Sequence, residues 1–519
     1  MNRFTRLMMF AGVAVGVAIL VSIIHHYQLR FAVDSYFAEL KSKGEPMDLA
    51  QVLPPVVSGE QNGAETLRQA ETLFGGPEDP LYTNCIEGMR MVAPSKALIA
   101  WKQPDIRDSD GTNTWDNMQS IVTRDEKALD FLHRIIQAPG LAFHIRYEVG
   151  VVGLDFSNMC LPEVKRSAMR LYSALECDLQ HGDSAEAVTN LRTMLALTKS
   201  LKDERLAISE LVRIAMTQIA ASATWELLQS TSLRDSDLSA LQNDWDNLEF
   251  IHAAETALNM ERVTEAIDLA KFRSSDSEFK KYFELGEGAR ASLGIPARVK
   301  SGFARLRDQG EYFLWRYWWS YPDELRYLKG LESISATFRR ADTNGAFYDA
   351  LASQKAALDQ LGMSNLTDEF DSLISDETDF YSILSQSVVS LEGFPRTVMR
   401  AQTAKEIVIS AIALRRYQLK HENYPPNLES LVPEFIASVP TDPVDGKPLR
   451  YRLISDGTFL LYSVGQNGRD DGGDPSVEKQ AKNPSYSWQN AQALDWVWPQ
   501  PPSAAKIETF YKTLSKSPR

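Results

Sequence analysis

An uncharged apolar run close to the N-terminus limits what this chain can fold into more than any other feature. The run from Met8 to Ile24 holds 17 residues without a charge, and as a helix it spans about 25 Å, close to the thickness of a bilayer core. Arg3 and Arg6 precede it and only Arg30 follows closely, which predicts a cytoplasmic N-terminus. The end of the run, 21–26, lacks the paired small residues of a signal-peptidase site. We therefore expect an uncleaved anchor within 1–30.

The anchor sets the expected localisation. We expect Met8–Ile24 to lie in the lipid bilayer of the cell inner membrane, as a single pass. The bulk of the chain then lies in the periplasm.

Charge and cysteine content exclude several classes of protein. Among 519 residues, 55 Lys+Arg face 69 Asp+Glu, a net charge of −14, so the field repels phosphate backbones and we expect no nucleic-acid partner. The three cysteines, Cys85, Cys160 and Cys177, form no C-x-x-C pair. They allow one intramolecular disulfide at most and exclude a zinc ribbon.

The region 31–395 repeats apolar residues at the spacing of a helix, so the fold class is predicted to be mainly α. Its clearest part is a helical hairpin: an apolar stripe over 168–179, the break at Gly182 and Asp183, and a second stripe over 187–201. This pair resembles a tetratricopeptide-type hairpin, but we find no second copy at a fixed period. We therefore expect an irregular antiparallel helical domain. Further helices are predicted at 65–73, 124–137, 206–219, 235–248, 252–272, 295–319, 323–340 and 346–361.

An aromatic run at 312–321, YFLWRYWWSY, admits two interpretations. We expect its rings to fill the core of the helical domain. The alternative is contact with a partner or a membrane surface, which rings with polar tips also favour.

A polar loop holds Asp105, Asp108, Asp110 and Asp116 around Gly111. Its oxygen atoms suit calcium or carboxylate-assisted hydrolysis, but the EF-hand pattern fails, and we expect a solvated loop.

No sequence motif with known catalytic mechanics is present: G-x-S-x-G, the P-loop, H-E-x-x-H and G-x-G-x-x-G after a strand are all missing. Histidines are scattered, without a sequence partner that would orient a base. We therefore expect no enzyme, with a periplasmic hydrolase using Asp108 and Asp110 as the alternative.

The character of the chain changes near residue 396. A strong helix over 401–421 leads into a proline-rich connector with a short helix at 428–431. A hairpin at 449–454 and 458–464 follows, turning at Ser455-Asp456-Gly457. Asp495-Trp496-Val497-Trp498 is predicted to return to this unit as a short strand. We expect an α+β module with a small antiparallel sheet over 396–502 and a polar, weakly packed tail over 503–519.

The module resembles a known family. Y-P-P-x-L-x-x-L-V-P, then V-P-x-D-P-x-x-G-x-P-L-x-Y and F-x-L-Y-S-V-G-x-N-G-x-D-D-G-G, over 400–495, is similar to the globular part of the type II secretion major pseudopilin, the G-type subunit. The resemblance implies a calcium loop with Asp470, Asp471 and Asp474 as ligands, completed by carbonyls of 463–468. A solvated turn held by Asx hydrogen bonds explains the same residues.

The chain also departs from that family. Its apolar segment lies far upstream of the module's helix, and a G-F-T-L-x-E processing site is missing from residues 3–14. Incorporation into a secretion filament is therefore not expected.

The whole arrangement resembles uncharacterised bacterial membrane-anchored proteins. We expect a non-enzymatic, single-pass envelope protein with a protein-interaction or scaffold role, linked to type II secretion or pilin-like systems. Its protein partner is not identified by the sequence.

Overall fold

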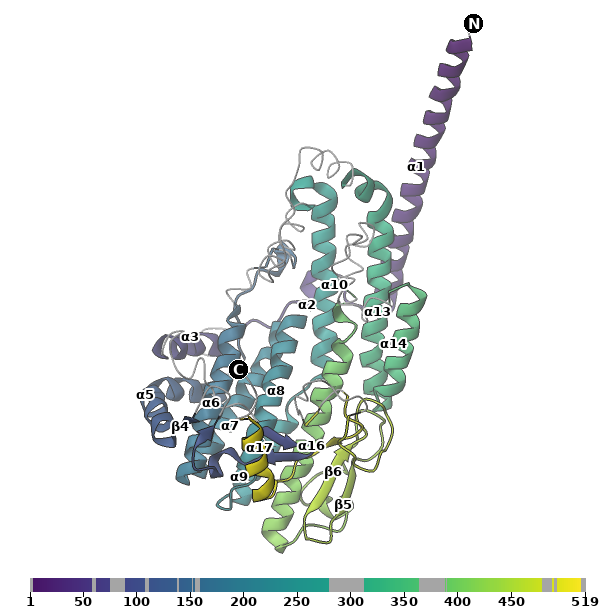
Figure 1. Cartoon of the computed structure of the whole chain (residues 1–519). Coiled ribbons are helices and arrows are strands. Elements are labelled where there is room, and N and C mark those ends of the chain that lie inside the picture. Colours follow the sequence, from purple (N-terminus) through teal and green to yellow (C-terminus); the bar gives the residue numbers. More distant parts are fainter. Residues whose placement is uncertain are drawn as a thin grey trace.

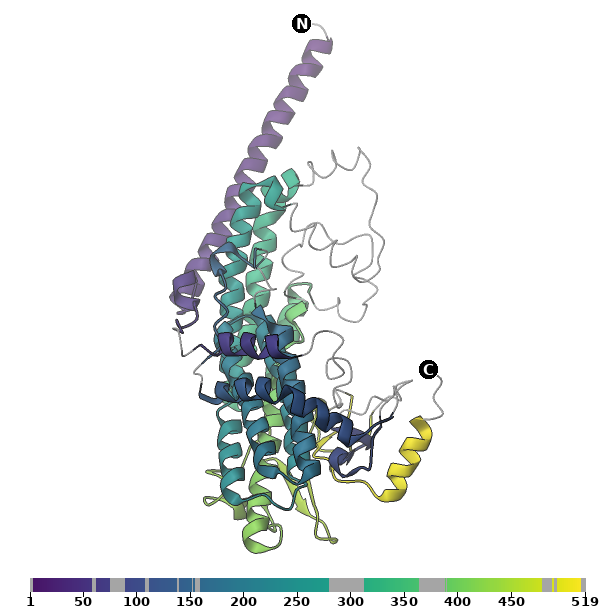
Figure 2. The same ribbon diagram turned by 90° about the vertical axis from the view of Figure 1, so that its left-hand side faces the viewer.

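The computed structural model shows a long N-terminal helix that projects from a helical body, with a small sheet at the opposite end (Figure 1). The view turned by 90° also shows the free end of this helix far from the helix near the C-terminus, Ala504–Leu514 (Figure 2). The structure describes residues 3–57, 62–74, 89–107, 112–137, 140–151, 153–154, 159–279, 312–363, 388, 390–477, 488–489 and 492–514.

Helices dominate the described residues, as predicted. The α-helices are α1 (Arg3–Ser42), α2 (Leu49–Val52), α3 (Gly63–Leu73), α5 (Trp115–His133), α6 (Leu161–His181), α7 (Ser184–Ser200), α8 (Ala207–Leu227), α9 (Asp235–Asp246), α10 (Ile251–Ser274), α13 (Ser320–Asn344), α14 (Tyr348–Gln360), α16 (Phe394–His421) and α17 (Ala504–Leu514). Shorter 3-10 turns are η2 (Ala100–Lys102), η3 (Arg134–Gln137), η4 (Tyr147–Val149), η6 (Leu201–Glu204) and η9 (Leu428–Leu431), and η7 (Trp315–Trp319) is a π-helix.

Three small antiparallel sheets lie in the described part of the chain. Two are two-stranded hairpins, β1 (Arg90–Ala93) with β2 (Lys96–Leu98) and β3 (Ile106–Arg107) with β4 (Thr112–Asn113). The first hairpin also bridges to Gln500. The third has the order β5-β6-β7, from β5 (Arg450–Leu453), β6 (Phe459–Ser463) and β7 (Trp496–Val497).

Helix α1 is divided by its surroundings into an exposed half and a packed half. Over residues 9–24 its side chains are exposed, and the helix is long and apolar enough to cross a membrane. Further along, Val33, Tyr36, Phe37 and Leu40 recur at helical spacing and pack against the body. The predicted anchor therefore continues as a stalk that docks on α13.

The predicted helical hairpin is confirmed as α6 and α7. Gly182 ends α6 in the left-handed conformation with φ of 85°, and the Asp183 side chain caps α7 by accepting from the backbone N–H of Glu186. Helix α8 packs against both helices. The two residues that the sequence predicts to end one helix and begin the next, Gly182 and Asp183, do so in the structure.

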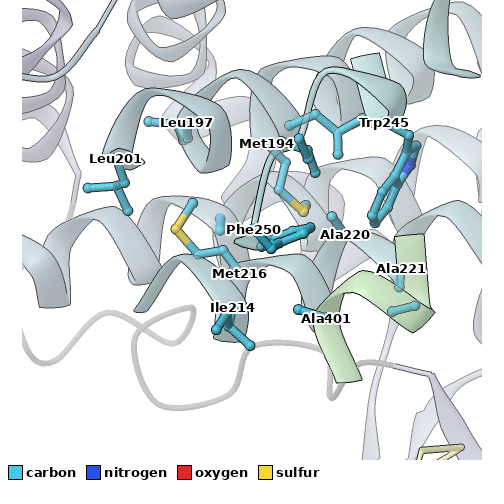
Figure 3. Packing of buried hydrophobic residues seen from close by; sticks show 14 of the residues in the cluster. Met194, Leu197, Leu201, Ile214, Met216, Ala220, Ala221, Trp245, Phe250 and Ala401 are labelled. Atoms are coloured by element: carbon cyan, nitrogen blue, oxygen red, sulfur yellow. The ribbon is translucent and has the colours of Figure 1, made fainter. Parts of the chain in front are cut away.

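The core of the body joins helices from distant parts of the chain. Figure 3 shows Met194 of α7, Met216 of α8, Trp245 of α9 and Phe250 in one cluster with Ala401 of α16. Nearly all of α16 up to Leu414 is buried, mainly against α8 and α9. One hydrophobic core thus runs through both 31–395 and 396–502, and the domain boundary at 396 stays a prediction.

The C-terminal sheet agrees with the predicted hairpin and strand. β5 pairs with β6 from Arg450 opposite Tyr462 to Leu453 opposite Phe459, and β6 pairs with β7 through Ser463 opposite Trp496. Trp496 and Trp498 are buried, as predicted. Strand β6 lies against α16, so a small antiparallel sheet does pack on a long helix.

One prediction of local structure is wrong in part, and another is only partly tested. The tail 503–519, predicted only as polar and weakly packed, forms α17, whose Phe510 ring lies 5.6 Å from the guanidinium of Arg90. Most of its described side chains do stay exposed. In the predicted helix 295–319, residues 295–311 lie outside the described residues and the end is a π-helix.

The aromatic run was also predicted wrongly in part. Trp315 is fully buried, but Phe313, Leu314, Tyr317 and Trp318 are exposed. The expected aromatic core therefore holds for Trp315, and for Tyr312 and Trp319, which are partly buried and pack against the core. Phe313, Leu314, Tyr317 and Trp318 face outward.

The cysteines show no described disulfide. Cys160 is half-buried and Cys177 is buried, and neither forms a disulfide within the described residues, outside which Cys85 lies.

A buried cluster of charges fixes the stalk to the body. Arg262 of α10 is fully buried, and its guanidinium lies 2.7 Å from Glu45 and 3.2 Å from Glu332. Arg339 of α13 pairs with the same two carboxylates and lies 3.4 Å from Glu255. Glu45 follows directly on the end of α1, so both arginines hold the chain where the stalk ends. Because Arg262 is shielded from water, losing one of its partners would leave a buried charge uncompensated.

We predict that Arg262→Ala destabilises the full chain by about 3–5 kcal/mol, because Glu45 and Glu332 keep buried charges without this partner. The measurement is urea unfolding of the detergent-solubilised protein. Arg30→Ala is the control, because Arg30 is exposed and its ion pair with Asp34 of the same helix is exposed too. Equal unfolding midpoints for the two variants would contradict the assigned role of the cluster.

Candidate functional site

The three acidic residues predicted as calcium ligands lie in one loop after β6, each with a protein partner of its own. Asp470 accepts a hydrogen bond of 2.9 Å from the Tyr462 hydroxyl, and Asp471 accepts one of 2.9 Å from the Asn467 amide. The carboxylate of Asp474 accepts from the backbone N–H of Ser476 at 2.9 Å. Both side-chain and Asx-type bonds therefore hold this loop, as the solvated-turn alternative describes.

The loop closes around a fourth carboxylate that sequence reasoning did not assign to it. Asp495 is buried, and it accepts from the backbone N–H groups of Asp471, Gly473 and Asp474 at 3.4, 2.7 and 3.1 Å. Burial raises the pKa of Asp495 to about 6, although the three N–H groups lower it. From the sequence, residues 495–498 (D-W-V-W) could be predicted as a short strand. That pattern gives no information on the groups that Asp495 binds.

A glycine allows this closure. Gly473 has φ of 81°, and a Cβ atom there would lie 2.6 Å from Leu460 of β6. The loop passes too close to the sheet for any larger residue.

The arrangement does not form a calcium shell as it stands. Within the ranges that the structure describes, no group of three or more His, Cys, Asp or Glu side chains is placed to hold a metal ion. Calcium binding at Asp470, Asp471 and Asp474 stays a prediction.

A groove lies where the connector before β5 crosses the helical body. It has a volume of about 390 Å³, and its walls are α9, α16 and the extended segment 436–441. Ala437 and Ser438 are exposed on the connector wall, and Glu406 and Ile409 line the α16 wall. A cavity of this size accommodates a small ligand or one or two side chains of a peptide.

Polar side chains brace the groove. Gln242 of α9 donates to the carbonyl of Phe435 at 2.7 Å, and Arg416 of α16 donates to the side-chain oxygen of Gln242 at 3.1 Å. Arg416 also pairs with Asp235 at 2.8 Å. These bonds join α9, α16 and the connector, so the groove is pre-formed.

One carboxyl inside the groove has an altered affinity for protons. Burial raises the pKa of Glu406, although Lys405 and the hydrogen bond from Gln402 lower it. The amide of Gln402 donates to Glu406 at 2.9 Å. The groove wall therefore offers a carboxyl beside serine hydroxyls and exposed backbone, which suits hydrogen bonding to a polar partner.

Sequence reasoning did not find this groove. It identified 422–448 as an ordered, proline-rich connector, but the connector meets α9 almost 200 residues earlier in the chain. Neither segment has a sequence pattern that would predict its contact with the other.

Other carboxyls of the helical body are buried. Glu176 of α6 and Glu226 of α8 are both fully buried, and Glu226 accepts from the backbone N–H of Ala100 at 3.1 Å. Burial raises the pKa of both carboxyls, and the charge of Glu176 raises that of Glu226 further. They are enclosed by helices, so they act on the stability of the body and not on a substrate.

Burial raises the pKa of Glu204 as well, and its hydrogen-bond partners are defined. It accepts from the backbone N–H of Phe143 at 3.0 Å and from the Tyr147 hydroxyl at 3.3 Å. Burial raises the pKa of Glu204 to about 7 despite these bonds. On α10, burial likewise raises the pKa of Glu261 to about 7.

The carboxylates considered for hydrolysis, Asp108 and Asp110, lie outside the described residues, as does Gly111. Asp116 is exposed, as expected, but it lies in the first turn of α5 and not in a loop, because α5 begins at Trp115, earlier than the predicted start at 124. No observation in the described part of the chain favours the hydrolase alternative.

Comparison with known proteins finds no match to the chain among family models, curated proteins or solved structures. The resemblance to the secretion pseudopilin therefore stays a prediction.

We predict that Asp495→Ala lowers the free energy of unfolding by about 2 kcal/mol, because three backbone N–H groups lose their acceptor. Asp471→Ala is the matched control from the same loop, since Asp471 is exposed and its carboxylate accepts from the Asn467 side chain and not from the backbone N–H groups that Asp495 binds. Chemical denaturation of the full chain measures both. A larger loss in the control would show that the loop is not organised by Asp495.

We predict that Glu204 makes the fold less stable as pH rises from about 4.5 to 7. Its pKa is raised on folding, so in this window the unfolded chain releases a proton that the folded chain keeps, and stability falls by up to about 1.4 kcal/mol per pH unit. Glu204→Gln should therefore flatten the curve of unfolding midpoint against pH. Glu148→Gln, at an exposed position, is the control, and an unchanged slope in Glu204→Gln would contradict the prediction.

Proposed function

We propose that the chain is a non-enzymatic, single-pass membrane-anchored envelope protein that binds a protein partner through the groove between α9, α16 and 436–441. The observation that carries the proposal is this pre-formed groove of about 390 Å³, lined by a mixture of polar and aliphatic side chains. It belongs to a body whose N-terminal helix is long and apolar enough to cross a membrane.

The groove is better suited to binding than to chemistry. The residues that line it, all in the described part of the chain, include no histidine, cysteine or lysine. Arg416 is committed to Asp235 and Gln242. Exposed backbone at 437–438 beside aliphatic Ile409 and Ile436 is the mixture that peptide segments use.

The position of the groove favours a partner in the same compartment as the body. It lies in the half of the molecule that holds α9 and α16, away from the free end of α1 (Figure 1). With the N-terminus in the cytoplasm, as the flanking arginines predict, the groove would face the periplasm. A link to secretion or pilin-like systems rests on the sequence resemblance alone.

Photo-crosslinking in the native membrane tests the proposal. A benzophenone amino acid in place of Ser438, on the exposed wall of the groove, should give a discrete crosslinked product. Ser353 on the exposed face of α14 is the control position, and it should give none. Identical patterns from the two positions, or no product from Ser438, would remove the groove as the binding surface.

Calcium is a separate part of the proposal. Binding would require Asp470 to leave the Tyr462 hydroxyl and Asp471 to leave Asn467, so that their carboxylates turn to one ion. If this occurs, the full chain should melt at a higher temperature in millimolar calcium than in chelator, because a ligand of the folded state stabilises it. Equal melting temperatures would discard the calcium loop.

A further inference from the structure

The end of the body beside the anchor carries a cluster of exposed apolar and aromatic side chains. Phe313, Leu314, Tyr317 and Trp318 are 58, 43, 38 and 37% exposed. They lie within six consecutive residues, and together we call them the aromatic tip. A contiguous exposed patch of this kind is unusual in a soluble body and marks a contact surface.

A π-helix presents these rings to the outside. The turn Trp315–Trp319 directs Trp315 inward, where it is fully buried and its ring lies 4.7 Å from that of Phe279. Its neighbours Tyr317 and Trp318 face outward on the same turn. Such π-turns are commonly found at functional sites. The inward Trp315 secures the turn, so the outward rings are held in place.

The aromatic tip adjoins the point where the apolar run of α1 ends. The ring nitrogen Nδ1 of His26 lies 2.9 Å from the carbonyl of Tyr317, and the rings of His25 and Trp318 are 5.5 Å apart. Residues 9–24 of α1 extend beyond this contact with their side chains exposed. Figures 1 and 2 both show the upper end of α13 beside the middle of α1.

The chemistry of the tip matches the surface of a bilayer. Tyrosine and tryptophan rings favour the level of the lipid headgroups, where the ring is in a partly apolar region and its polar atom reaches water. Arg316, between Leu314 and Tyr317, can extend its guanidinium toward headgroup phosphates. If α1 spans the membrane from Met8 to Ile24, the next residues, His25 and His26, lie at the interface, and the tip lies at the same level.

We propose that the aromatic tip is a second membrane-contact surface, inserted into the headgroup region of the leaflet from which α1 emerges. The inference rests on the proposed anchor. It adds that the body touches the bilayer directly and is not held away from it by a free stalk. A bilayer is favoured over a protein partner because the tip is continuous with the helix that enters the bilayer.

The test uses the full chain without its native cysteines, with single cysteines labelled by the polarity-sensitive fluorophore NBD. The protein is reconstituted in phosphatidylcholine nanodiscs with and without lipids that carry a quenching spin label near the headgroup. Leu314→Cys reports on the tip and Ile19→Cys on the anchor. Leu453→Cys is the control, because Leu453 is 44% exposed and lies in β5, at the end of the body opposite the N-terminus.

The proposal predicts that the spin-labelled lipid quenches the label at 314 by about half and leaves the label at 453 unchanged. Phe313→Cys provides a second tip position and should behave like Leu314→Cys. If the label at 19 is quenched and the labels at 314 and 313 are not, the aromatic tip does not contact the bilayer, whereas the anchor proposal is retained. No spectral response of the label at 19 to the bilayer would overturn the anchor, and the tip with it.

Discussion

The cluster of buried charges around Glu45 is the constraint on which the arrangement of this molecule depends. Two arginines, Arg262 and Arg339, meet the carboxylates of Glu45 and Glu332, with Arg262 fully buried and the other three partly buried. Charges taken out of water are stabilised only in good geometry. The cluster therefore specifies one orientation of the stalk on α10 and α13. If the apolar half of α1 lies in a membrane, this orientation also fixes how the body meets the bilayer.

The second coupling is hydrophobic and lies further from the anchor. Helix α16 begins the C-terminal module in sequence, yet its side chains fill the core between α8 and α9. Lys405 adds two hydrogen bonds, to the carbonyls of Asp246 and Leu248 after α9. The module is therefore held against the helical body along its main helix, and the groove exists because this packing brings the connector onto α9.

Features fixed by neighbouring residues could be predicted from the sequence, and features fixed by tertiary contact could not. Gly182, Asp183 and the turn at Gly457 act within a few residues of themselves, and their predicted roles agree with the structure. Asp495 gave no such signal, because its partners lie more than 20 residues before it. The composition of the aromatic run suits a core and an interface equally, so the sequence could not tell that Trp315 is buried while Tyr317 and Trp318 of the same π-helix face outward.

Hydrogen exchange in the full chain, reconstituted in nanodiscs, tests most directly whether the stalk is part of the body. Mass spectrometry would compare peptides from 28–42 of α1 with peptides from 320–344 of α13. If the charge cluster and the stripe from Val33 to Leu40 dock the stalk, both segments should exchange at rates within about tenfold of each other, because they open together. Stalk amides that exchange far faster than those of α13 would show an independent helix and contradict the account.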